Sequence, residues 1–249
     1  MRKLFFALLA LALIMTGCAT GAAPQKQPVA AQDQKLSPAM DPSVPKLCAL
    51  TFDDGPDAVK TPKVLDRLQK YNVPATFFLV GMNVNDRTKA VMERQVALGC
   101  EFGNHTWTYN DMAKMTAEQV KASVDKTDAA IKKYTGQTPK FFRAPNLSAS
   151  KTMYETINKP FCEGVLAFDW DQKTTAESRA KAVLNGVSDG AIILMHDVQP
   201  DPHPTPEALD IIIPELKKRG YTFVTLSELF KQKGVDPNSK KNAMWKVVK

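Results

Sequence analysis

The chain from residue 47 to residue 56 reads Leu47-Cys48-Ala49-Leu50-Thr51-Phe52-Asp53-Asp54-Gly55-Pro56. Its first six residues are mostly apolar and carry no charge, which predicts a short buried strand over Leu47–Phe52. Two carboxylates and a Gly-Pro pair follow directly, so the strand is expected to end in a turn at this point. The stretch therefore predicts a strand with ionisable side chains at its carboxyl end.

Strand and helix patterns alternate along the chain after this stretch. Predicted strands follow at 75–80, 101–105, 140–143, 165–169, 191–196 and 222–226. One predicted helix begins near Thr61, a candidate N-cap before Pro62, and others cover 86–98, 116–134, 175–187 and 205–216. Thr116 and Gln119 form a predicted capping box. About seven strands alternating with helices predict an α/β fold whose parallel sheet is closed, or nearly closed, into a barrel.

Ionisable residues stand at the carboxyl ends of five predicted strands. They are Asp53 with Asp54, His105, Arg143, Asp169, and His196 with Asp197. Active sites of α/β barrels gather at this end of the strands. The pattern therefore predicts one site to which five separate strands contribute.

The residue types at these positions suit metal-assisted hydrolysis of an acyl group. The chain has only three histidines, His105, His196 and His203, and the first two stand at predicted strand ends. A carboxylate and an imidazole can bind a divalent ion such as zinc or cobalt, which activates water and polarises a carbonyl group. A second carboxylate then serves as base, and a histidine on the other side serves as acid.

Five segments resemble the motifs of the NodB-type polysaccharide deacetylases, carbohydrate esterase family four. In chain order they are Thr51–Pro56, Gly103–Trp107, Arg143–Pro145, Asp169–Trp170 and Leu194–Asp197. Their order and spacing agree with the family over about residues 46–230. The resemblance implies a distorted (β/α) barrel with about seven parallel strands and a deacetylase site on its carboxyl rim.

The resemblance also implies a role for each candidate residue. The catalytic group comprises Asp53 as general base, His196 as general acid, Arg143 positioning Asp53, and Asp169 positioning Arg143. The implied ligands of the divalent metal ion, zinc or cobalt, are Asp54 and His105. The residues expected to contact the substrate are Trp170 and Leu194 in the acetyl pocket, Pro145, Asn146 and Tyr109. A backbone N–H near Asn146 is expected to help stabilise the oxyanion.

One position departs from the family pattern. The second motif normally carries a further metal-binding histidine four residues after the first, and Tyr109 occupies that position here. A neutral phenol is a poor ligand for a divalent ion because its pKa is about 10. We therefore expect Asp54, His105 and water to hold the ion. His203 is an alternative ligand, although its proline-rich surroundings predict a solvated loop residue.

Several functions remain open on these residues. Tyr109, Asn146 and the segment His196–Pro200 are similar to acetylxylan esterases of the family, which favours O-acetyl groups of acetylxylan as the substrate. N-deacetylation of N-acetylglucosamine in chitin oligomers or peptidoglycan passes through the same oxyanion and is the alternative. Another class is a catalytically impaired carbohydrate-binding protein. A glycosidase with Asp53 and Asp169 as its carboxylates would leave the strand-end histidines without a role.

The first residues predict export. Residues 1–3 are basic, residues 4–15 are apolar, and Met15-Thr16-Gly17-Cys18 resembles the cleavage site of bacterial lipoproteins. We therefore expect a signal peptide over 1–17, and over 18–45 a lipidated Cys18 with a flexible tether. This predicts an exported lipoprotein, anchored to a membrane on its periplasmic or cell-surface side. Residues 46–232 are expected to form the deacetylase domain and residues 233–249 a basic, peripheral tail.

Composition limits the other partners. The net charge of +7 comes from scattered basic residues without an arginine-rich stripe, which argues against a nucleic-acid partner. Cys48, Cys100 and Cys162 show no CxxC spacing, which excludes a zinc ribbon and allows at most one disulfide among them. We expect a monomer that acts on an acetylated polysaccharide.

Overall fold

The computed structural model describes residues 45–109 and 112–249. The predicted signal peptide, Cys18 and the tether up to residue 44 lie outside the described residues. No helix within those two ranges is both long and apolar enough to cross a lipid bilayer.

The central sheet is built from parallel strands. They are β1 (Lys46–Asp53), β2 (Thr76–Leu79), β3 (Glu101–Asn104), β5 (Val165–Leu166), β6 (Ala191–His196) and β7 (Tyr221–Phe223). Their order is β3-β2-β1-β6-β5, and β7 pairs with the amino-terminal part of β1. β1 pairs with three strands and is buried from Leu47 to Asp53. This burial on both faces explains why its sequence is a continuous apolar run rather than an alternating one.

The strand register brings the predicted site residues to one rim. Asp53 pairs with His196 between β1 and β6, and β3 ends directly before His105. Since these strands are parallel, their carboxyl ends lie on the same side of the sheet. The sequence prediction of one shared site therefore agrees with the register.

The barrel closes through short and irregular pairings. Phe142 alone bridges β3 at Asn104 and β4 (Phe161–Cys162). The prediction of a strand over 140–143 is therefore wrong, because only one of its residues forms bridges. The predicted strand over 165–169 likewise stops at Leu166.

The last residues of the chain complete the closure. β8 (Met244–Trp245) pairs with β4, and Val247 bridges Ala191 in the antiparallel sense. Trp245 and Val248 are buried among the apolar side chains of the core. The prediction of a peripheral tail over 233–249 is therefore wrong, because this segment fills the gap between β4 and β6.

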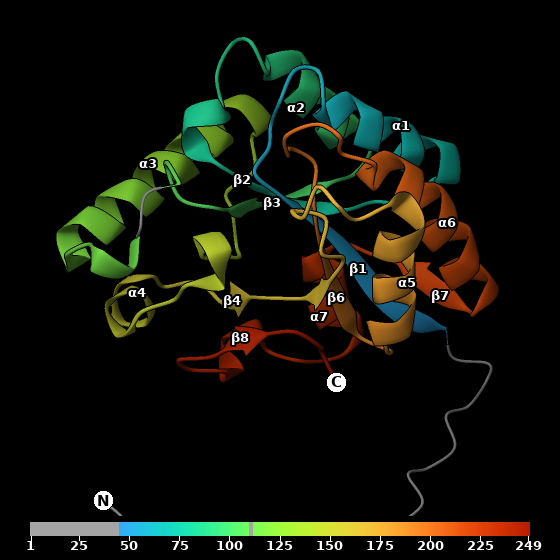
Figure 1. Ribbon diagram of the computed structural model, residues 1–249. Helices are drawn as coiled ribbons and strands as arrows, with labels where there is room; N and C mark the ends of the chain where they lie inside the picture. The colour runs from blue at the N-terminus through green and yellow to red at the C-terminus, as the bar shows by residue number, and fades with distance from the viewer. Residues whose placement is uncertain (1–44, 110–111) are drawn as a thin grey trace, which may run out of the picture. The chain divides into compact units, whose positions relative to one another are not determined.

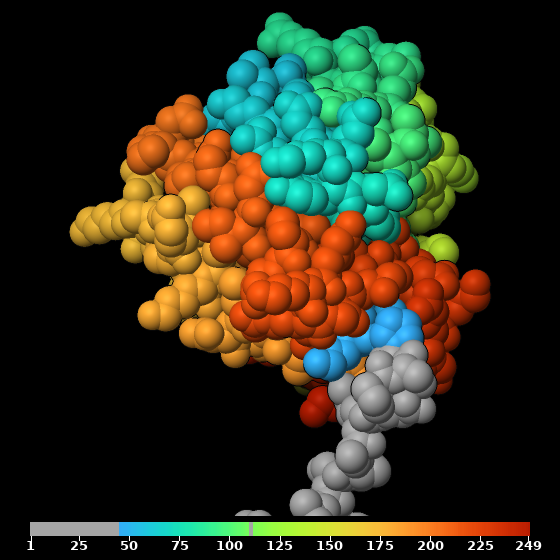
Figure 2. Space-filling model, turned by 90° about the vertical axis from the view of Figure 1, so that its right-hand side faces the viewer, coloured from blue at the N-terminus to red at the C-terminus, as the bar shows by residue number. Residues whose placement is uncertain are grey.

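Helices cover the outside of the strands (Figure 1). In the described part of the chain, the α-helices are α1 (Thr61–Tyr71), α2 (Lys89–Ala97), α3 (Ala117–Thr135), α4 (Lys151–Thr156), α5 (Ala176–Gly186), α6 (Thr205–Lys218) and α7 (Leu226–Gln232). Short 3₁₀ helices lie at Gly81–Asn83, Met112–Lys114, Pro145–Leu147 and Pro237–Ser239. Figure 2 shows α1 and α6 side by side on one face, where Arg67 of α1 binds Asp210 of α6 at 3.3 Å.

Local sequence patterns predict both ends of α3 but not the N-cap of α1. Thr116 and Gln119 form the predicted capping box of α3, and Gly136 ends that helix with a φ of 74°, which glycine adopts freely. Thr61, by contrast, is the first residue of α1 and not its N-cap. Its hydroxyl donates to Asp197 instead and accepts the N–H of Asp57.

The cysteines belong to the core. Cys48, Cys100 and Cys162 are buried free thiols, so no disulfide joins the cysteines of the described ranges. Burial raises the pKa of Cys100 to about 11 and that of Cys162 to about 12. These thiols are therefore unreactive packing groups.

Candidate active site

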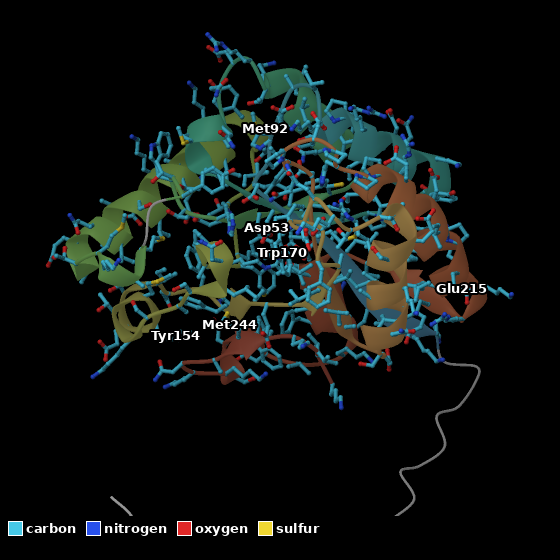
Figure 3. The ribbon with its side chains drawn as sticks, viewed as in Figure 1. Asp53, Met92, Tyr154, Trp170, Glu215 and Met244 are labelled. Atoms are coloured by element: carbon cyan, nitrogen blue, oxygen red, sulfur yellow. The ribbon has the colours of Figure 1, made fainter. Side chains whose placement is uncertain are left out.

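A cavity of about 530 Å³ opens at the carboxyl ends of the strands. Its lining residues are Asp53, Asp54, His105, Tyr109, Pro145, Asn146, Leu147, Leu166, Trp170, Leu194, His196 and Gln199. Figure 3 labels Asp53 and Trp170, which lie near each other in the middle of the domain. The structure thus brings together all the predicted site residues except Arg143 and Asp169, which are buried next to lining residues.

Arg143 holds Asp53 at the end of β1. Both residues are buried, and Nη1 of Arg143 donates to Oδ1 of Asp53 at 2.6 Å. The other guanidinium N–H groups donate to the carbonyl oxygens of Cys162 and Glu163 at 3.3 and 3.0 Å. The guanidinium also lies 4.1 Å from the ring centre of Phe78. With its donors engaged, Arg143 fixes one carboxylate oxygen of Asp53 and leaves Oδ2 for other partners, as the sequence predicts.

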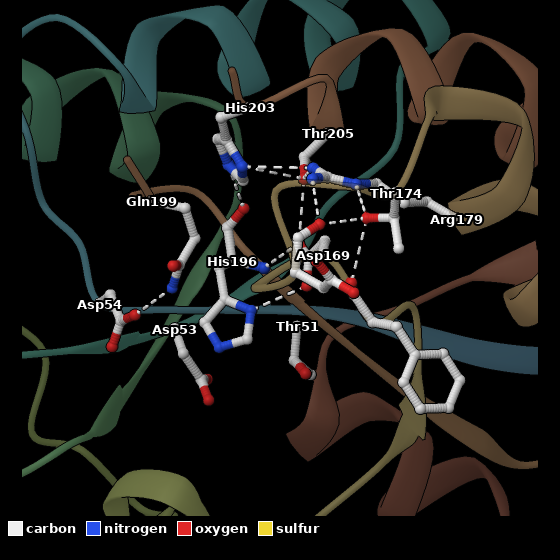
Figure 4. A network of polar contacts seen from close by, with 12 residues as sticks. Thr51, Asp53, Asp54, Asp169, Thr174, Arg179, His196, Gln199, His203 and Thr205 are labelled. Atoms are coloured by element: carbon white, nitrogen blue, oxygen red, sulfur yellow. Dashed lines mark hydrogen bonds and ion pairs between the residues drawn. The ribbon is translucent and has the colours of Figure 1, made fainter. Parts of the chain in front are cut away.

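Asp169 binds His196 twice. Nδ1 of His196 lies 2.8 Å from Oδ1 of Asp169, and the backbone N–H of His196 donates to Oδ2 at 2.7 Å. Burial by itself lowers the pKa of His196, but the charge and hydrogen bond of Asp169 outweigh it and raise the pKa to about 9. His196 is therefore protonated near neutral pH, with Nδ1–H held by Asp169 and Nε2 directed toward Asp53 (Figure 4). A histidine in this state can act as a general acid.

The predicted contact between Asp169 and Arg143 is wrong. Leu166 of β5 pairs with Leu194 of β6, so the segment that continues from Leu166 to Asp169 runs beside the end of β6 rather than beside Arg143. Asp169 is 1% exposed, with both oxygens engaged, and it does not line the cavity. A glycosidase that used Asp53 and Asp169 as its two carboxylates is therefore excluded by position.

Asp54 turns toward the same cavity as Asp53 because of its backbone. Adjacent side chains on a strand point to opposite faces, but Asp54 follows β1 with a left-handed φ of 78°. Gly55 continues this turn, and a Cβ atom there would collide with the carboxylate of Asp197. Gln199 then fixes the Asp54 side chain, because its Nε2 donates to Oδ2 at 2.8 Å.

His105 and Asp54 have the chemistry and spacing of a cation site. Nδ1 of His105 lies 2.8 Å from the carbonyl oxygen of Arg143 and must donate to it, so the lone pair of the neutral ring is on Nε2. This Nε2 lies 3.5 Å from Oδ1 of Asp54 and 3.9 Å from Oδ2 of Asp53. Two ligands of one tetrahedral zinc ion are about 3.4 Å apart, so the pair fits a divalent ion.

The electrostatics of this corner also favour a cation. Burial lowers the pKa of His105, but the carboxylates of Asp53 and Asp54 outweigh it and raise the pKa above its usual value. The same negative field attracts a metal ion. Within residues 45–109 and 112–249, no set of three or more His, Cys, Asp or Glu side chains is placed to hold a metal. Among the described residues, Asp54 and His105 are therefore the pair that could hold such an ion.

Comparisons with known proteins agree with this geometry. The family model described as polysaccharide deacetylase matches residues 41–160. A peptidoglycan-N-acetylglucosamine deacetylase of Bacillus cereus is 34% identical over 198 residues, which cover 77% of this chain and 92% of that protein. The structure of a family 4 acetyl xylan esterase from Clostridium thermocellum, in complex with a cobalt ion, has a TM-score of 0.79 and 59% identity. That match covers 82% of this chain and 99% of the other. This chain belongs to the polysaccharide deacetylase family, carbohydrate esterase family four.

Membership confirms the resemblance and the predicted distorted α/β barrel. A bifunctional xylanase/deacetylase of Pseudobutyrivibrio xylanivorans is also similar, with 51% identity over 193 residues that cover 78% of this chain. The present chain spans 32% of the length of that relative.

Tyr109 lines the cavity, as the sequence predicts, whereas His203 is not the solvated loop residue that was expected. Tyr109 is 51% exposed, and its hydroxyl donates to the backbone carbonyl of Asp54 at 3.1 Å. Burial of the hydroxyl and the Asp54 charge raise the pKa of the phenol, so it stays neutral and remains a poor metal ligand. His203 was expected to be solvated but is partly buried, and its Nε2 donates to the carbonyl oxygen of His196 at 3.0 Å. It therefore does not substitute as a metal ligand.

Trp170 and Leu194, the residues predicted for the acetyl pocket, line the same cavity. The rings of Trp170 and His196 meet edge-on with 6.1 Å between their centres, and Leu194 is buried beside them. Asn146 and Leu147 line the cavity with left-handed φ values of 53° and 55°. Such strained backbone is common where a fold presents groups to a ligand.

The five motif segments leave out three residues that support this site. Gln199 orients Asp54, Thr205 donates to Oδ2 of Asp169 at 2.9 Å, and Arg179 of α5 contacts Thr205. For Gln199 and Thr205 the available signal was weak, because they are polar residues in the proline-rich stretch that follows His196.

Proposed function

We propose that this deacetylase is a metal-dependent esterase that removes O-acetyl groups from acetylated xylan. The observation that carries the proposal is the pairing of Asp53 and His196 across β1 and β6, where each has its own buried partner and both face one cavity. A base and an acid with separate partners can hold different protonation states at one pH. Hydrolysis of an ester needs both states at once.

The metal would be held by Asp54 and His105, and this oxygen and nitrogen pair suits zinc or cobalt. Such an ion, when bound, polarises the acetyl carbonyl and lowers the pKa of water in the site. The cobalt ion in the structure of the Clostridium thermocellum esterase supports this assignment. Gln199 keeps Oδ1 of Asp54 directed toward His105 by holding Oδ2.

The protein's own groups move the protons. Asp53 accepts the proton of the attacking water at Oδ2, while Arg143 holds Oδ1 and the carboxylate plane. His196 donates its Nε2 proton to the sugar oxygen as the bond between that oxygen and the acetyl carbon breaks. Asp169 keeps Nδ1–H in place, so Nε2 faces the reacting group throughout. Trp170 and Leu194 exclude water from the methyl side of the acetyl group.

The choice of an O-acetyl substrate is supported by the relatives. Identity to the acetyl xylan esterase and to the xylanase/deacetylase is higher than identity to the peptidoglycan-N-acetylglucosamine deacetylase. N-deacetylation of N-acetylglucosamine in chitin oligomers or peptidoglycan uses the same base and acid, and is the alternative outcome of the test.

The test is acetate release by the purified protein from acetylated xylan and from N-acetylated chitin oligomers in parallel. Each substrate is given to chelator-treated protein and to the same protein after zinc or cobalt is restored. We expect release that requires metal and is faster from xylan. Release that survives chelation, or a faster reaction with the chitin oligomers, would overturn the corresponding part of the proposal.

We also propose that the enzyme acts at a membrane surface through a lipidated Cys18, on the evidence of residues 1–18 alone. Expression in a bacterial host with radiolabelled palmitate tests this. The wild-type protein should carry label and partition with membranes, whereas Cys18→Ser should do neither. Equal labelling of both proteins would contradict the proposal.

A further inference from the structure

Arg179 of α5 is a buried cation whose surroundings are unusual. It is 0% exposed, yet no carboxylate in the described ranges lies within ion-pair distance of it. A buried guanidinium is costly unless its donors and charge are compensated. The compensating groups therefore indicate what this arginine does.

The donors of Arg179 reach the loop that follows the general acid (Figure 4). Nε donates to Oγ1 of Thr174 at 2.9 Å, and Nη1 donates to Oγ1 of Thr205 at 3.0 Å. Nη1 also lies 3.3 Å from Nδ1 of His203. Each of the last two contacts begins a path to His196.

The first path runs to the imidazole ring. Thr205 accepts from Arg179, so its own hydroxyl hydrogen is free for Oδ2 of Asp169, which lies 2.9 Å away. Oδ1 of Asp169 then holds Nδ1 of His196. Arg179 thereby fixes the orientation of Thr205 and, through it, the carboxylate that fixes the ring.

The second path runs to the backbone of the same residue. Nε2 of His203 lies 3.0 Å from the carbonyl oxygen of His196, which can only accept, so the hydrogen of His203 is on Nε2. Nδ1 of His203 then carries a lone pair and accepts from Arg179. Burial and the nearby Arg179 charge lower the pKa of His203, which keeps the ring neutral in this tautomer.

We propose that Arg179 is a positioning residue that holds the general acid His196 from two sides, its ring through Thr205 and Asp169 and its backbone through His203. The inference rests on the proposed function, because it gives His196 the role of acid. Loss of Arg179 would displace the proton donor His196 by a fraction of an ångström without removing any contact to the substrate. It therefore lowers kcat and leaves KM nearly unchanged.

The tests use Arg179→Met, which removes the charge and the donors, and Arg179→Lys, which keeps the charge with fewer donors. Arg219→Met is the matched control, since Arg219 also links α6 to α5, through the carbonyl oxygen of Leu184, but makes no contact with the site. We expect kcat for acetate release to fall about tenfold or more in Arg179→Met, with KM within about twofold of wild type. Arg179→Lys should recover part of the loss, and Arg219→Met should lose nothing.

A second readout does not depend on the reaction. The chain has three histidines, so a ¹⁵N–¹H NMR spectrum of the zinc-loaded or metal-free protein can resolve every imidazole. Wild-type His203 should show the neutral tautomer with hydrogen on Nε2, and Arg179→Met should lose it and shift the Nδ1–H signal of His196. Thr205→Val should shift His196 while His203 keeps its tautomer, because only the first path is broken.

The outcomes separate the two proposals. If wild type releases no acetate but these imidazole signals change as stated, the proposed function fails and the two-sided support of His196 stands. If wild type is active, and Arg179→Met leaves kcat and both histidine signals unchanged, Arg179 is a packing residue and the inference is wrong. Should Arg179→Met fail to fold, Arg179→Lys and Thr205→Val carry the same comparison.

Discussion

The two sides of the cavity hold their functional side chains with different kinds of contacts. On the proton-transfer side, Asp53 and His196 each bind a buried charged partner, Arg143 or Asp169, whose remaining polar atoms are themselves bonded. On the metal side, the carboxylate of Asp54 accepts a hydrogen bond from Gln199 and lies 3.5 Å from Nε2 of His105, while Tyr109, which binds the Asp54 carbonyl oxygen, is half exposed. The first side is fixed by the fold, and the second by a few contacts near solvent.

Asp53 and His196 are therefore held by partners that belong to neither metal ligand. A buried pair that loses one member leaves an uncompensated charge, which affects both folding and the reaction. A ligand with a single orienting contact affects metal affinity instead. Substitutions on the two sides should therefore give different combinations of kcat, stability and metal affinity.

The largest effect is expected for Asp53→Asn. Loss of the base should lower kcat about 10²- to 10⁴-fold, and Arg143 should be left with an amide in place of its carboxylate, costing roughly 3 kcal/mol of unfolding free energy. Acetate release and urea unfolding measure the two losses. Asp66→Asn is the control, because its pair with Arg94 is exposed and contributes at most about 1 kcal/mol. Wild-type kcat in Asp53→Asn would remove Asp53 from the mechanism.

Asp169→Asn tests the acid by pH. In the metal-free protein the His196 pKa of about 9 lies above the value of 6.5 for a free histidine. Protonated His196 therefore stabilises the fold fully below pH 6.5, and this stabilisation is lost as the pH rises toward 9. Its size is on the order of 3 kcal/mol. Asp169→Asn should flatten this part of the curve and lower kcat about 10²-fold.

The measurement for this variant is urea unfolding of the metal-free protein at several pH values across that window. Asp171→Asn is the control, since Asp171 is exposed and its side chain bonds only the backbone N–H of Lys173. An unchanged pH dependence in Asp169→Asn would show that the carboxylate does not set the protonation of His196.

The sequence was sufficient to predict the residues at the strand ends and the pairing of Arg143 with Asp53, but not the partner of Asp169. Strand ends can be predicted where an apolar run stops at an ionisable residue, as at Asp53 and His196. Parallel strands then bring such ends together. The partner of Asp169 depends instead on the register of β5 against β6. Nothing in the local sequence encodes that register, so the prediction of an Arg143 contact failed.

For a related reason, the sequence did not predict that residues 233–249 complete the barrel. Residues 233–249 are rich in lysine and lack a periodic pattern, yet Trp245 and Val248 are buried. A two-residue strand has no pattern of its own, and it is stable only because β4 and β6 leave a gap that it fills. Tertiary context, rather than local propensity, determines such an element.

Gln199→Ala should act on the metal side alone. Loss of the bond to Oδ2 frees Asp54 to rotate away from His105, so zinc affinity should fall about 10- to 100-fold. At saturating zinc, kcat should be close to that of wild type, because the base and the acid keep their partners. Calorimetric titration of zinc into metal-free protein measures the affinity. Gln172→Ala is the control, since Gln172 is exposed and bonds only the carbonyl oxygen of Asp201. A loss of kcat that saturating metal does not restore would contradict the separation of the two sides.

The smallest effect is expected at Tyr109, and it tests how open the metal side is. Tyr109→Phe loses only the hydrogen bond to the carbonyl of Asp54, worth about 1 kcal/mol, so zinc affinity should weaken by less than about tenfold. Tyr109→His should tighten zinc binding by a similar factor, because a neutral imidazole is a better ligand than a phenol. The gain is limited because Tyr109 is half exposed, so a histidine there must be ordered before it can bind. The same zinc titration measures both variants. If Tyr109→His left the affinity unchanged, residue 109 would be directed away from the ion, and the metal side would depend on Asp54, His105 and Gln199 alone.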